Sequence, residues 1–144
     1  MFATGGSSLK SPLVHQENIL TILFDDLLEV VKDTEVVIKM DIEGSECRAL
    51  QNSTQFFSEI KVHAIFMEFM NLRKYLGGES MTTGKRCVFN MVAYLRGLGF
   101  VPRDLKTNFK FGGQAPLEDT AMRKWPNDIV WTRSQQEMNQ VLRK

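Results

Sequence analysis

Three acidic side chains follow an apolar run in this chain, and their types and spacing are suited to chemistry. Residues 36–40 are apolar except for one lysine, and after them come Asp41, Glu43 and Glu46, in a turn that contains Gly44. A short β-branched run of this kind predicts a strand covered on both faces, followed by a turn into a helix. Ligands of open α/β sheets collect where strands end, so these carboxylates are candidate site residues.

Two interpretations of Asp41 and Glu43 stay open at this stage. Both carboxylates could simply complement the dipole of the helix that follows them. Alternatively, Asp41 faces a crevice at the strand end and orients or deprotonates a hydroxyl group of a ligand. Glu68 also ends an apolar run, and it is either a second carboxylate of that crevice or the partner of Arg73 in an ion pair.

The same carboxylates raise the question of a metal ion. Asp41, Glu43 and Glu68 together offer the oxygen ligands that a hard cation such as magnesium takes. Because a group of carboxylates does not by itself establish coordination geometry, we expect no metal here. His63 opens an apolar run, which favours a structural histidine over a catalytic base.

Two strands with a helix between them must position these residues. Residues 36–40 and 62–67 are the predicted strands, and a helix from Ser45 has about the right length to join them. Crossovers of this kind are local and connect parallel strands of one sheet. We therefore expect the strands to be adjacent and parallel, with Asp41 and Glu68 at the same end of the sheet.

The rest of the chain continues the alternation of helices and strands. Residues 76–86 are a predicted glycine-rich loop, and residues 87–98 a predicted helix with one apolar face. Strands are predicted from residue 100 and from residue 127, and the long segment 107–126 between them has aromatic residues that favour an ordered lid. This order predicts an α/β fold.

The acidic turn resembles the Lys-x-Asp-x-Glu-Gly-x-Glu signature of the FkbM family of methyltransferases. The matching residues are Lys39, Asp41, Glu43, Gly44 and Glu46. Weaker agreement comes from Asp25-Asp26-Leu27-Leu28 before the signature, from the strand that ends in Glu68, and from the late strand at residues 128–131. The resemblance covers roughly residues 19–132.

This resemblance implies a Rossmann-like class I methyltransferase fold. It also implies an S-adenosylmethionine-dependent O-methyltransferase that acts on a hydroxyl of a small molecule or sugar. Asp41 and Glu43 are then the catalytic candidates, and Glu68 and Glu46 are the substrate-binding candidates. The expected organisation is an irregular leader at residues 1–15, a partial FkbM-like domain at residues 16–133 and a tail helix at residues 134–144.

The glycine-rich turn with which the family holds S-adenosylmethionine has no counterpart before the signature. Gly5 and Gly6 follow only a few residues and no strand, so they predict a flexible leader. We expect a fold that lacks the N-terminal cofactor-binding strands, and weak or no cofactor binding by this chain alone. The alternative function is that of a non-catalytic interaction protein, which kept the acceptor-side half of the fold and lost the cofactor side. A metal-binding hydrolase is a third and weaker hypothesis.

Two structural expectations follow from the resemblance. Class I methyltransferases end in an antiparallel hairpin at the sheet edge, which residues 100–105 and 127–132 would supply. In these enzymes the strand equivalent to residues 36–40 is central and pairs on one side with the cofactor-binding strand. Loss of that neighbouring strand would leave an open apolar edge, which residues 19–23 would cover only partly. Such edges pair with other chains, so we expect self-association or a partner strand.

Composition and charge exclude several kinds of partner. The 144 residues are 43% hydrophobic, which is enough for one core. The net charge of +1, from 18 basic and 17 acidic residues, gives no electrostatic case for nucleic acid or an anionic membrane. No apolar run approaches the roughly 20 residues that span a bilayer, and no signal-peptide pattern is present, so the default location is cytoplasmic. Cys47 and Cys87 lack metal-ligand spacing and are expected to be reduced thiols.

Overall fold

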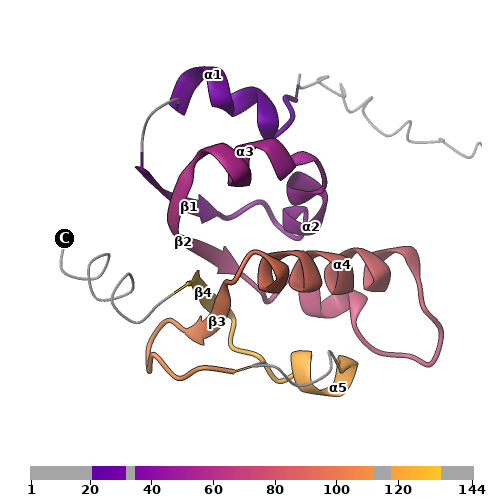
Figure 1. Cartoon of the computed structure of the whole chain (residues 1–144). Coiled ribbons are helices and arrows are strands. Elements are labelled where there is room, and N and C mark those ends of the chain that lie inside the picture. The colour runs from indigo at the N-terminus through magenta and orange to yellow at the C-terminus, as the bar shows by residue number, and fades with distance from the viewer. Residues whose placement is uncertain (1–20, 32–34, 112–117, 134–144) are drawn as a thin grey trace, which may run out of the picture.

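The computed structural model describes residues 21–31, 35–111 and 118–133. The predicted leader at residues 1–15 and the predicted tail helix at residues 134–144 lie outside these ranges. The described chain is a mixed α/β structure in which one four-stranded sheet carries the helices (Figure 1).

The sheet has the strand order β1-β2-β4-β3. Its strands are β1 (Glu35–Met40), β2 (Lys61–Glu68), β3 (Val101–Asp104) and β4 (Asp128–Thr132). β1 and β2 are parallel neighbours, whereas β4 is antiparallel to both β2 and β3. The predicted adjacency of the first two strands and the predicted antiparallel pair at the edge of the sheet are therefore confirmed.

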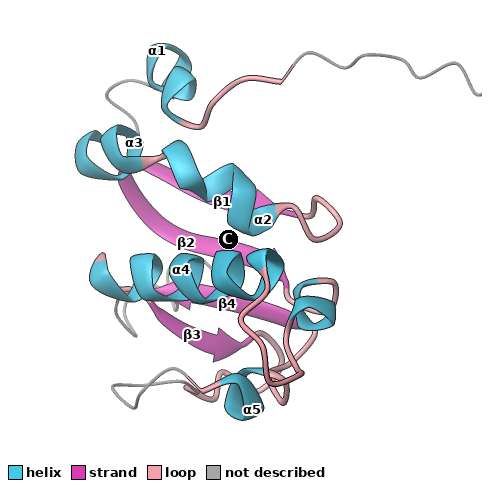
Figure 2. Ribbon diagram, turned by 90° about the vertical axis from the view of Figure 1, so that its right-hand side faces the viewer, coloured by secondary structure: helices cyan, strands magenta, loops and turns pink. Residues whose placement is uncertain are grey.

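The helical segments between the strands are mostly short. They are η1 (Asp25–Leu27), α1 (Leu28–Val31), α2 (Glu46–Ala49), η2 (Leu50–Asn52), α3 (Thr54–Glu59), η3 (Leu72–Tyr75), α4 (Thr83–Gly97) and α5 (Asp119–Met122). Figure 2 shows α2, α3 and α4 in front of the sheet, on one of its faces. The largest core cluster lies between that face and these helices. It includes Ile65, Met67, Val88, Leu95, Ile129 and Trp131.

β1 departs from the expected doubly covered strand. Its residues alternate between exposed and partly buried positions, and Val37 is 50% exposed. The reason lies in the topology, because β1 is at the end of the strand order and, among the described residues, it pairs with β2 alone. The side of the sheet away from the main core carries a second, smaller cluster in which Ala64 and Val130 are fully buried.

α4 begins earlier than the sequence pattern predicts, within the segment expected to be a loop. The hydroxyl of Thr82 caps the helix by accepting a hydrogen bond from the backbone N–H of Lys85 at 3.1 Å. Gly84 sits in the first turn because a Cβ there would lie 2.4 Å from the Tyr75 ring. Gly84, which suggested a loop in the sequence, thus lies in a helix and permits the close packing of the Tyr75 ring against it. The Lys85 ammonium lies 2.5 Å from Asp119 and, by its hydrogen bond, lowers the pKa of that carboxyl.

The segment predicted as a lid is anchored to the core where it is described. Phe111 packs on Trp125 with ring centroids 4.9 Å apart, and Trp125 packs on Trp131 at 5.9 Å. Phe109 is 70% exposed instead.

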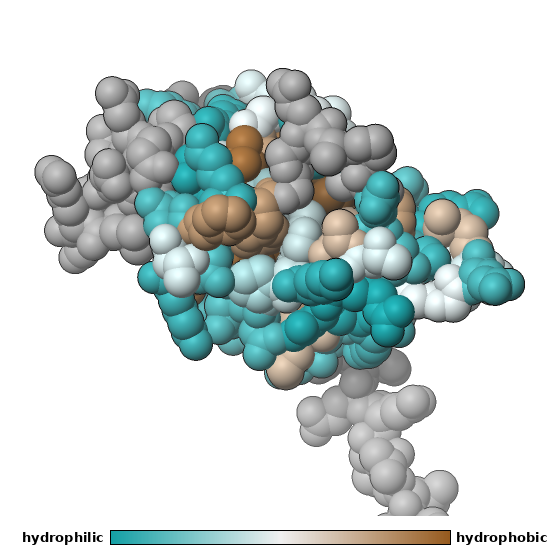
Figure 3. Space-filling view, turned by 90° about the horizontal axis from the view of Figure 1, so that it is seen from below, coloured by the Kyte–Doolittle hydropathy of each residue, from teal (hydrophilic) through white to brown (hydrophobic). Residues whose placement is uncertain are grey.

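The surface seen from below is largely hydrophilic with a limited apolar area (Figure 3).

The two cysteines contradict the expectation of reduced thiols, because Cys47 and Cys87 form a disulfide that joins α2 to α4. They are 40 residues apart in sequence, and the sequence spacing could not show that the two helices pack side by side. In the part of the chain that is described, no helix has both the length and the apolar character needed to cross a membrane.

The exposed position of β1 leads to the first testable prediction, which concerns association. Val37→Lys should weaken self-association of the full chain about tenfold, because an added charge on an edge strand opposes pairing with another chain. Light scattering coupled to size-exclusion chromatography over a range of concentrations measures this. Val30→Lys is the matched control, since Val30 is 79% exposed but lies on α1. A monomer at every concentration would contradict the prediction.

The disulfide gives a second prediction, on stability. Replacing both cysteines by serine should lower the free energy of unfolding by about 4 kcal/mol, because the bond closes a long loop in the unfolded chain. Urea denaturation of the oxidised protein and of the double variant measures the difference. A reductant should destabilise the parent protein to a similar extent and leave the variant unchanged. Equal stability of the two proteins would show that the cross-link does not constrain the unfolded chain.

Candidate functional site

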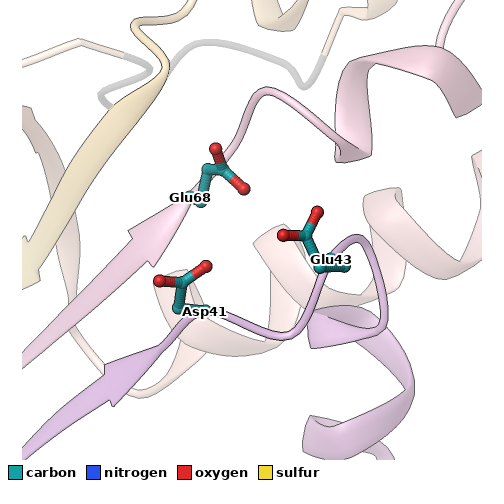
Figure 4. A group of neighbouring side chains, drawn as sticks. All are labelled: Asp41, Glu43 and Glu68. Carbon is teal, nitrogen blue, oxygen red and sulfur yellow. The ribbon is translucent and has the colours of Figure 1, made fainter.

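Three carboxylates converge at the carboxyl ends of the two parallel strands. Asp41 directly follows β1, Glu43 lies in the turn beyond it, and Glu68 is the last residue of β2. One oxygen from each of these side chains lies within 4.8 Å of the others (Figure 4). The parallel register pairs Met40 with Met67, which brings the residues after them to the same end of the sheet. The expectation that Asp41 and Glu68 emerge together is confirmed.

The turn that presents Glu43 has an unusual backbone. Glu43 has a φ of +54° and Gly44 a φ of +91°, so two consecutive residues are left-handed. A side-chain-bearing residue in this region costs about 1–2 kcal/mol, and such strain is found preferentially at functional sites. The conformation leaves the Glu43 carboxylate facing the other two carboxylates (Figure 4).

Glu46 lies apart from these three carboxylates. Its side chain is fully buried, and its Oε1 accepts hydrogen bonds from the backbone N–H groups of Ile42 at 3.4 Å and Gly44 at 3.3 Å. The residue expected to bind substrate is therefore placed beneath the turn, where it holds the backbone that carries Glu43.

Asn71 completes the site and was not identified from the sequence. Its side-chain amide donates one hydrogen bond to Glu43 at 2.7 Å and another to Glu68 at 3.0 Å. These bonds offset the repulsion between two neighbouring carboxylates, because hydrogen bonds to charged groups are strong. The only sequence signal was its position three residues after Glu68, and that spacing has no distinctive pattern.

The contacts bear differently on the alternatives from the sequence. Asp41 lies 3.4 Å from the Lys39 ammonium and Glu43 accepts a hydrogen bond from Asn71, and the interpretation that they complement the dipole of α2, which begins at Glu46, stays a prediction. The suggested ion pair between Glu68 and Arg73 is absent from the described contacts, in which Arg73 bonds to Asn127. His63 bonds to Glu35 at 2.7 Å, as a structural histidine would.

A pocket of about 270 Å³ opens beside the carboxylates. Its lining combines Asp41, Glu68 and Asp128 with the apolar side chains of Phe66 and Leu105. Asp128 is paired in register with Glu68 across β2 and β4 and was recognised in the sequence only as the start of a strand. A small pocket that combines several hydrogen-bond acceptors with apolar side chains suits a ligand that carries hydroxyl groups.

Exposed carboxylates often gather without a metal, so the convergence alone does not establish a cation site. A hard divalent cation would find three oxygens here, but the Asn71 amide already donates to two of these carboxylates. The arrangement is equally able to accept hydrogen bonds from ligand hydroxyls. The expectation of no metal stays a prediction.

The glycine-containing turn after β1 is a possible backbone cradle for S-adenosylmethionine, and the expectation of weak or no cofactor binding stays a prediction. Among the described glycines with positive φ, Gly44 alone follows a strand and precedes a helix. A Cβ at Gly44 would meet the Lys74 ammonium at 3.2 Å and Asn71 at 3.4 Å, so these two side chains pack close to the turn.

Comparisons with known proteins add no relative from which a role could be carried over. No family model, no curated protein and no solved structure matches this chain. The function must be argued from the site itself.

The strained turn yields a third prediction. Gly44→Ala should lower the free energy of unfolding by about 1–2 kcal/mol, because its left-handed φ disfavours a side chain and Lys74 crowds the added methyl group. Gly97→Ala is the control. Gly97 ends α4 with open space around it, so alanine should be neutral or stabilise by about 0.5 kcal/mol. Chemical denaturation measures both, and equal effects of the two substitutions would contradict the turn geometry.

Proposed function

We propose that this chain supplies the acceptor-binding half of an S-adenosylmethionine-dependent O-methyltransferase of the FkbM kind, acting on a hydroxyl of a small molecule or sugar. The observation that carries the proposal is the convergence of Asp41, Glu43 and Glu68 at the ends of two adjacent parallel strands. This is the place where open α/β sheets bind ligands. The resemblance of the acidic turn to the family's signature agrees with it.

Each carboxylate has a separate part in this proposal. Asp41 lies at the pocket mouth and is bonded only loosely to an exposed lysine, so it is available to accept a ligand's hydroxyl hydrogen and its proton. Glu68 accepts a second hydroxyl beside it. Glu43 is held by Asn71 and keeps the cluster electronegative, while Glu46 positions the turn from beneath.

We assign the acceptor alone to the described residues, because the resemblance places the cofactor on a glycine-rich turn that has no counterpart before the signature. Binding of the acceptor and binding of the cofactor can therefore be measured independently. This assignment also leaves a second candidate function, a non-catalytic interaction protein, which the exposed edge of β1 favours. Acceptor binding at the carboxylates distinguishes the two candidates.

The experiment is a binding screen with the full chain. Saturation-transfer NMR against a panel of monosaccharides and polyols should identify binders, and Asp41→Asn should weaken them about tenfold or more, because a hydrogen bond to a charged acceptor is lost. Glu29→Gln removes an exposed carboxylate on α1 and should have no effect. No hydroxyl ligand, or equal binding by the two variants, would overturn the acceptor assignment.

Binding of S-adenosylmethionine is predicted to be weak or absent in the same preparation. Equilibrium dialysis with labelled cofactor measures it. Tight, saturable binding that is lost in Asp41→Asn would show that the described residues hold the cofactor after all.

A further inference from the structure

A groove runs between α2 and α4, on a different part of the molecule from the acidic cluster. Two adjoining cavities of about 350 and 260 Å³ form it, and both are lined by Cys47, Gln51, Cys87 and Asn90. The disulfide is therefore part of the wall of both cavities. Their size is that of sites for small ligands.

The groove is positively charged at one end. Arg48 and Arg86 line the larger cavity, and both side chains are exposed. Within the described ranges neither is in an ion pair, and neither cavity is lined by Asp or Glu. Two guanidinium groups without a partner favour an anionic ligand, and carboxylates suit their forked donors.

The disulfide can be attacked from this groove. Cys87 is only partly buried, whereas Cys47 is 5% exposed, so Cys87 is the more exposed of the two residues. Gln51 Nε2 lies 3.6 Å from Cys87 Sγ and donates toward it, which would stabilise the Cys87 thiolate that leaves in the second exchange step. Exchange rates depend on the thiolate fraction and nucleophilicity of the attacking thiol, on the leaving thiol and on access to the sulfur.

We propose that this groove admits small anionic thiols, of which glutathione is a representative, to exchange with the Cys47–Cys87 disulfide. An incoming thiolate attacks Cys87 Sγ, forms a mixed disulfide with it and releases the Cys47 thiolate. A second thiolate then attacks the sulfur of the bound small thiol, which releases the Cys87 thiolate and the oxidised small disulfide. Two small thiols are oxidised and one protein disulfide is reduced, so protons and electrons balance.

Exchange at this point bears on the acidic turn. Cys47 follows Glu46 directly, and the disulfide fixes that part of α2 to α4. Reduction removes the one disulfide cross-link between the two helices among the described residues. Reduction of the disulfide by external thiols would therefore release a constraint on α2 next to Glu46, whose side chain holds the backbone of the turn that carries Glu43.

The test compares two thiols of opposite charge on the oxidised full chain. Glutathione and cysteamine are supplied at equal thiolate concentration and low ionic strength, and alkylation with mass spectrometry follows Cys47 and Cys87. Glutathione should react severalfold faster. The double variant R48Q/R86Q should slow glutathione about threefold or more and remove its advantage, and added salt should do the same. The trapped mixed disulfide should be on Cys87.

K110Q/K124Q is the matched control, because it removes the same charge from exposed positions outside the groove. It should keep the preference for glutathione. Near-ultraviolet circular dichroism shows that each variant remains folded. Equal rates for the two thiols, an unchanged preference in R48Q/R86Q, or two free thiols in the protein as isolated under non-reducing conditions would overturn the proposal.

Discussion

The buried carboxylate of Glu46 is the interaction on which the acidic turn depends. It is fully buried, and its hydrogen bonds go to the backbone N–H groups of Ile42 and Gly44. A buried carboxylate is costly unless it is hydrogen-bonded, so the two bonds to Oε1 favour one backbone path through the turn, while Oε2 is buried with no partner among the described residues. That path makes Glu43 left-handed and turns its side chain toward Glu68. The proposed acceptor site is thus built on a residue that does not touch the ligand.

The sheet supplies the other half of the site. Parallel pairing of β1 with β2 places Asp41 beside Glu68, and the antiparallel β4 adds Asp128 at the same end. Helices on one face hold the strands through a common core, while the opposite face near β1 remains partly exposed. A site at the end of this sheet therefore combines a rigid framework with an open mouth.

Much of this arrangement could be predicted from the sequence because it follows from local pattern. The apolar runs before Asp41 and Glu68 and the helical segment between them were sufficient to predict two parallel strands that end together. Features that depend on tertiary contacts were missed. The Cys47–Cys87 bond requires α2 to lie against α4, and the early start of α4 requires the Tyr75 ring to pack on Gly84. The bonds of Asn71 to two carboxylates likewise exist only in the folded chain.

We propose that a hydroxyl ligand binds at the cluster of Asp41, Glu43 and Glu68, in which Asn71 links the last two. The Asn71 side-chain amide is a direct reporter, because its two donors contact Glu43 and Glu68. Its resonances can be followed by nitrogen-15 NMR while a bound polyol or sugar is titrated into the labelled protein. We predict saturable shifts of this amide, with the same dissociation constant as that of ligand binding. Saturation of ligand binding with the Asn71 amide unmoved would contradict the proposal.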